Sequence, residues 1–142
     1  MNTFKKNAFS LIELLIVVAI IGVLAALVVS SFSTVTEDAR SVMVIQQQAS
    51  LQEALNSWIS MASSSTGYGS LQAAKSKYDD ATTATAKLAL LAPYLDATTL
   101  KQYSAHATVA NALNTDTMKK NNQYVTFSAW TTGSYPKVEL GP

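Results

Sequence analysis

Residues 5–30 read KKNAFSLIELLIVVAIIGVLAALVVS, and this stretch decides the fold. Lys5 and Lys6 open it, and the nineteen residues 11–29 follow with Glu13 as their one polar side chain. As a helix this run is about 28 Å long, which is enough to cross a bilayer core of about 30 Å. Because lysines remain on the cytoplasmic side, the sequence predicts a single-pass anchor with a cytoplasmic N-terminus.

A cleaved secretory signal peptide is the alternative for a basic start followed by an apolar run. The apolar core of such a peptide is usually about 7–15 residues, which is shorter than the run here. The polar pair Ser30-Ser31 is the one spot that resembles a cleavage site of that kind. The length of the run therefore favours an anchor that is not removed.

Glu13 needs an explanation, because a carboxylate at the centre of a bilayer costs about 2.5–3.5 kcal/mol and less near the interface. One interpretation is an interfacial charge that reaches the headgroups. The other is that Glu13 awaits a positive partner. Phe9 and Glu13 are four residues apart and share a helix face. A cut before Phe9 would create an ammonium group whose natural counter-ion is Glu13 of the same or a neighbouring chain.

Residues 5–26 resemble the class III signal of type IV pilins and type II secretion pseudopilins, and the resemblance extends to about residue 30. The basic leader, the Phe, the acid at the fifth place after it and the long apolar run all coincide. The resemblance implies that a prepilin peptidase cuts between Ala8 and Phe9 and then N-methylates Phe9. It also implies that Glu13 is the glutamate used in assembly.

Two positions depart from the pattern of that family. Ala8 stands where the residue before the cut is usually Gly, and Ser30 stands where many relatives have Pro. Proline removes a backbone donor and tends to kink a helix. Without it we expect the helix to run on smoothly past Val29, with Gly22 as a weak point.

Beyond the anchor, the sequence predicts an α+β fold. The hydrophobic helix continues as an amphipathic one to Ala62, because no Gly or Pro lies between Val23 and Met61. A small head then follows, with short helices and a C-terminal β-hairpin packed on the long helix, as in pilins. The predicted domains are a cleaved leader (1–8), the membrane and filament-core half of the helix (9–33), its amphipathic half (34–62) and the head (63–142).

Within the head, residues 71–78 and 82–92 are predicted as helices, the second capped by Asp79 or Asp80 and ended by Pro93. Asp96 is a candidate cap for a further short helix. The hairpin is expected from strands at 123–130 and 135–140, with a turn at 131–134. Residues 108–120 give no clear pattern.

The sequence predicts no enzyme, no cofactor and no metal site. The absence of cysteine excludes a thiolate nucleophile and Cys-ligated zinc. His106 is the only histidine, and neither a phosphate loop nor an HExxH signature is present. Asp79-Asp80 could be half of a calcium site, but Ca²⁺ takes six or more oxygen ligands, so a helix cap is favoured.

The resemblance implies a structural subunit that self-associates into a helical filament, with the prepilin peptidase, an inner-membrane assembly platform and the lipid bilayer as partners. The precursor would lie in the inner membrane and the filament in the periplasm or at the cell surface. One alternative is a minor pilin that binds DNA or a surface ligand at a filament tip; another is an ordinary single-pass anchored domain. With a net charge of +1, and Lys119-Lys120 as the only adjacent lysines of the head, no nucleic acid is expected.

Overall fold

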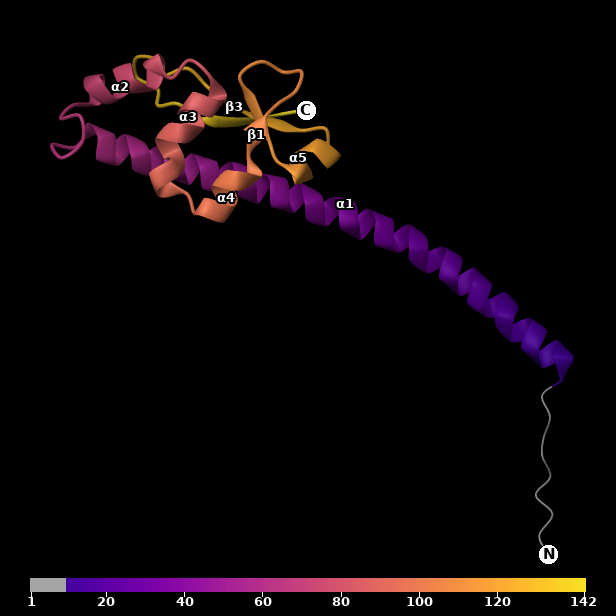
Figure 1. The fold of residues 1–142 in the computed structure, drawn as a ribbon. Coiled ribbons are helices and arrows are strands. Elements are labelled where there is room, and N and C mark those ends of the chain that lie inside the picture. The colour runs from indigo at the N-terminus through magenta and orange to yellow at the C-terminus, as the bar shows by residue number, and fades with distance from the viewer. Residues whose placement is uncertain (1–9) are drawn as a thin grey trace, which may run out of the picture. The chain divides into compact units, whose positions relative to one another are not determined.

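The computed structural model describes residues 10–142. The chain divides into two compact units, of which the first ends at Ala39 and the second comprises Arg40–Pro142. Helix α1, Leu11–Ser63, contributes to both (Figure 1). It confirms the prediction of one continuous helix over the apolar and the amphipathic segments, since nothing in this range interrupts the backbone ladder. A Cβ added at Gly22 would meet no atom within 4 Å, so this glycine fills no packing need.

The other helices all belong to the second unit, and a side chain caps the N-terminus of each α-helix among them. They are α2 (Leu71–Asp80), α3 (Ala84–Leu91), the 3-10 turn η1 (Ala92–Tyr94), α4 (Ala97–Gln102) and α5 (Asp116–Lys120). Asp96 caps α4 as predicted. The predicted acidic cap of α3 is wrong, because Asp79 and Asp80 form the last turn of α2. Thr83 caps α3 instead, its Oγ1 accepting from the Ala86 amide at 3.1 Å.

Four short antiparallel strands form one sheet in the order β1-β2-β3-β4. They are β1 (Ser104–Ala105), β2 (Ala112–Asn114), β3 (Tyr124–Phe127) and β4 (Val138–Gly141). The predicted C-terminal hairpin is confirmed as β3 and β4, with Thr126 opposite Glu139. Strands β1 and β2 extend it on the β3 side, and β2 comes from the segment for which the sequence showed no pattern.

The core lies between the sheet, α2, α3 and the part of α1 that belongs to the second unit. Three aromatic rings form its centre, with Tyr78 6.3 Å from Trp58 and 5.8 Å from Trp130 between ring centroids. Leu88 and Leu91 are buried in the same cluster, and the partly buried Leu95 packs against it. Burying these rings and aliphatic side chains supplies most of the stability that holds the second unit together.

Helix α1 also hydrogen-bonds to the edge of the sheet. The side-chain Nε2 of Gln48 donates to the backbone carbonyl of Val138 at 2.9 Å, and the side-chain Oε1 of Gln52 accepts from the Val138 amide at 2.7 Å. Val138 is on β4, which is an edge strand, so its outward backbone groups would otherwise be unpaired. Two glutamines one helical turn apart thus attach β4 to α1.

Candidate functional site

Glu13 lies in the first turn of α1, and its side chain caps the N-terminus of this helix. Its Oε2 accepts a hydrogen bond from the Ser10 amide at 2.9 Å, while the Ser10 carbonyl accepts from the amides of Glu13 and Leu14 at 3.0 and 3.2 Å. The carboxylate therefore satisfies an amide ahead of the first turn, where the helix dipole also favours a negative charge. This is the glutamate half of a capping box.

The contact between Glu13 and the Ser10 amide has a sequence signal, which the two interpretations of Glu13 as an interfacial charge or a counter-ion do not include. Ser10-Leu11-Ile12-Glu13 has the S-x-x-E pattern that precedes helices. A carboxylate has about four lone-pair sites, so one bond to Ser10 leaves room for a cation. Glu13 can thus cap its own helix and receive a positive partner. Ala8 and Phe9, the predicted cleavage and methylation residues, lie outside the described residues.

The surface around Glu13 is apolar and uncovered. Within the described residues, α1 is the one helix long and apolar enough to cross a membrane, and no residue of its apolar window is buried. Its large side chains are half to four-fifths exposed, from 50% at Val28 to 84% at Leu11. A continuous apolar surface of this size is costly in water and indicates contact with lipid or with another protein. The helix therefore fits a membrane-anchored precursor.

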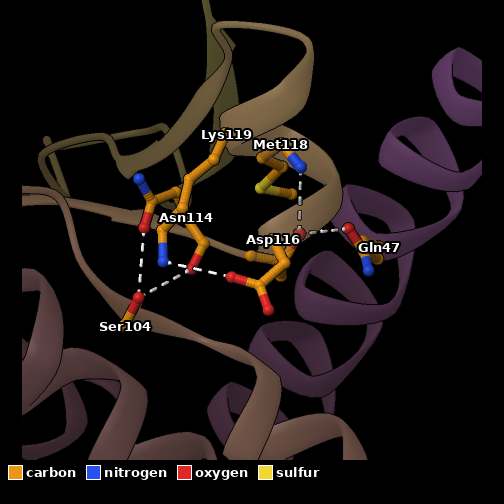
Figure 2. A network of polar contacts seen from close by, with 7 residues as sticks. Gln47, Ser104, Asn114, Asp116, Met118 and Lys119 are labelled. Atoms are coloured by element: carbon orange, nitrogen blue, oxygen red, sulfur yellow. Dashed lines mark hydrogen bonds and ion pairs between the residues drawn. The ribbon is translucent and has the colours of Figure 1, made fainter.

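A second candidate is a polar cleft of about 1030 Å³ between α1, α4 and α5. Thr115 Oγ1 donates to Gln47 Oε1 at 2.8 Å and accepts from the Met118 amide at 3.2 Å. Figure 2 shows the network of polar contacts to which Gln47 and Met118 belong. Ser104 Oγ donates to Asn114 Oδ1 at 3.1 Å. Each of these bonds joins one element to another or caps a helix. The network therefore positions α5 and β2 on α1, and Asp116 and Lys119 of the cleft lining form an ion pair with each other at 3.2 Å.

The remaining polar candidates have structural partners. His106 Nδ1 accepts from the amides of Thr108 and Val109 at 3.2 and 3.0 Å and so closes the loop between β1 and β2. Asp79 is ion-paired with Lys75 on the same helix. In residues 10–142 no three His, Asp or Glu side chains come together in a way that could hold a metal ion.

Comparison with known proteins gives one match. Residues 3–29 match the model of the prokaryotic N-terminal methylation motif. No curated protein and no solved structure matches the chain. The matched segment contains Glu13 and the whole apolar run of α1, and it ends at Val29. The chain therefore carries a signal of the class III kind found in type IV pilins and pseudopilins, and this signal supports a pilin-like protein that a prepilin peptidase processes.

Proposed function

We propose that this chain is a structural subunit of a type IV pilus-like filament or a type II secretion pseudopilus, cut between Ala8 and Phe9 and assembled through α1. The observation that carries the proposal is a methylation motif that continues directly into an exposed apolar helix. The motif points to a structural rather than a catalytic protein. In the precursor the apolar side chains of α1 contact lipid, and in the filament they contact the helices of other subunits.

Glu13 supports this function in two ways. In the single chain its carboxylate caps α1 through Ser10. After cleavage the amine of Phe9, on a neighbouring subunit, becomes its partner in apolar surroundings. A subunit in the wrong axial position would leave this carboxylate unpaired, and an unpaired charge away from water is strongly disfavoured. The pair therefore favours one register of assembly.

The processing step is tested by the intact mass of the protein from its native cells, with fragmentation of its N-terminus. We expect a chain that begins with methylated Phe9. A chain that begins at Met1, or one cut near Ser30, would contradict the proposal, because neither product enters a filament pathway.

The role of Glu13 is tested by comparing Glu13→Gln with Glu13→Ala. The amide oxygen of Gln can still accept from the Ser10 amide, whereas only the carboxylate can form an ion pair. We expect both variants to insert into the membrane and both to lose most filament yield, measured in filaments sheared from the cells. Normal yield from Glu13→Gln would show that Glu13 acts only as a cap.

A further inference from the structure

The polar cleft between α1, α4 and α5 has the size and the lining of a binding site. Its volume, about 1030 Å³, is at the upper end of the range for small-molecule sites. All of its lining residues lie between Met43 and Lys119, so the whole cleft belongs to the second unit. Of the described residues that line it, Met43 alone is apolar. This surface suits a ligand covered with polar groups.

The network that positions α5 and β2 uses only part of this lining. Within residues 10–142, four further lining side chains have neither a hydrogen-bond partner nor an ion-pair partner. They are Gln46 and Ser50 on α1, Lys101 on α4 and Thr117 on α5. The cleft thus presents one amide, two hydroxyls and one ammonium group from three helices. All four groups can bind a ligand without breaking a bond inside the protein.

The charges of the cleft favour a ligand that carries a carboxylate. Lys119 Nζ donates to Asp116 Oδ1 at 3.2 Å, so these two charges offset each other (Figure 2). The exposed ammonium group of Lys101 is then an excess positive charge in the lining. An ammonium group has three donors and no acceptor, and a carboxylate oxygen is its natural partner.

We propose that this cleft binds an oligosaccharide that carries carboxylate groups, such as a chain of uronic acids. The amide of Gln46 and the hydroxyls of Ser50 and Thr117 each donate and accept hydrogen bonds, as the hydroxyls of a sugar do. Lys101 pairs with a carboxylate of the ligand, and the half-exposed Met43 contacts the CH groups of a ring.

A peptide fits this cleft less well than a saccharide. Peptide sites commonly take apolar side chains into apolar grooves or add a strand to a sheet edge. The lining offers Met43 as its apolar side chain, and its strand residue, Ser104, belongs to a strand of two residues. The cleft contains no residue of the methylation motif, so binding there does not depend on the filament function.

Calorimetric titration of the full chain with trigalacturonate tests the site, in a detergent whose headgroup is not a sugar. We expect saturable binding with a Kd below about 1 mM. Two comparison ligands separate the contributions of the hydroxyls and the carboxylates. Galactotriose has the hydroxyls without the carboxylates, and acetylated, amidated triglutamate has three carboxylates without the hydroxyls. Each should bind at least about tenfold more weakly.

Substitutions locate the binding in the cleft. Lys101→Gln should lower the affinity for trigalacturonate about tenfold or more, and Gln46→Ala about threefold or more. The matched control is Lys120→Gln, which removes the same charge from a residue of α5 outside the lining and should lower the affinity less than about twofold. All three side chains are exposed, so tryptophan fluorescence in urea should show unchanged folding.

Three results would overturn the inference. The first is no saturable binding of trigalacturonate up to about 10 mM. The second is an equal loss of affinity in Lys101→Gln and Lys120→Gln, which would mean that overall charge and not the cleft attracts the sugar. The third is equal affinity for trigalacturonate and either comparison ligand. Equal binding of triglutamate would indicate a peptide as the occupant, and equal binding of galactotriose would remove the role of the carboxylate.

Discussion

Replacing Gln52 by Ala should destabilise the second unit much more than a surface substitution on the same helix. The Gln52 oxygen is the partner of the Val138 amide, at 2.7 Å, and Val138 is 4% exposed. Leaving a buried donor unsatisfied costs about 1–3 kcal/mol. For a domain of about 100 residues each kcal/mol corresponds to about 4–8 °C in Tm. We therefore expect Tm to fall by at least about 4 °C.

The assay can follow the second unit alone in the full chain in detergent. The protein has two tryptophans, and both Trp58 and Trp130 lie in its core. Their fluorescence during urea denaturation therefore reports on the second unit, whatever the apolar half of α1 does. Asn56→Ala is the matched control. Asn56 Oδ1 accepts from the side-chain Nε2 of Gln52, and this hydrogen bond is exposed to solvent.

The result that would refute this reasoning is a free energy of unfolding that changes equally, and by less than about 0.5 kcal/mol, in Gln52→Ala and Asn56→Ala. It would mean that the Val138 amide finds another partner, and that the glutamines do not attach β4 to α1. Gln48→Ala provides a further check, since it removes the bond to the Val138 carbonyl and leaves the amide paired.

Two further predictions concern the same unit. Gly67→Ala should lower the free energy of unfolding of this unit by about 1–3 kcal/mol in urea denaturation, since a Cβ there would lie 2.2 Å from the Met61 carbonyl oxygen. Gly22→Ala is the control, because a Cβ at Gly22 meets no atom within 4 Å, and it should leave the stability of this unit unchanged. Similar losses in both variants would contradict this prediction. Burial raises the pKa of Tyr103 to about 12, above its unfolded value of 10.0. The stability that the buried neutral hydroxyl contributes to folding is therefore fully present below pH 10 and is lost as the pH rises towards 12. Tyr103→Phe should lose less stability than the wild type between pH 10 and 12, and equal losses would count against that shift.

The features that the sequence predicted correctly are those that depend on residues close together in the chain. The apolar run gave the long helix, and the strand-forming residues at 123–130 and 135–140 gave the C-terminal hairpin. Asp96 was recognised as a cap because it directly precedes its helix. Asp79 and Asp80 misled the prediction, since acids can close one helix as well as open the next. Thr83, closer to α3, formed the cap.

The features that were missed depend on distant residues or on unusual backbone. Asn111, directly before β2 in the turn that joins β1 to β2, has a φ of 56°. Asn122, shortly before β3, has a φ of 52°. Asn can adopt this left-handed conformation, but Gly is its usual marker, so neither turn stood out. The bonds of Gln47 to Thr115 and of Gln52 to Val138 join residues 68 and 86 positions apart. No local pattern in the sequence predicts these two hydrogen bonds.

The two roles assigned to Glu13 are compatible because they use different parts of one carboxylate. The bond to Ser10 engages Oε2 and lies within the first turn of α1, so it forms before any other subunit arrives. A cap that already orients the carboxylate reduces the side-chain entropy that an ion pair would otherwise have to lose. In the proposed filament, the other lone pairs of the carboxylate would accept from the amine of a neighbouring subunit. The proposed assembly role thus depends on the charge of Glu13 and its capping role only on an acceptor oxygen, so Glu13→Gln, which keeps the cap and removes the charge, separates the two roles.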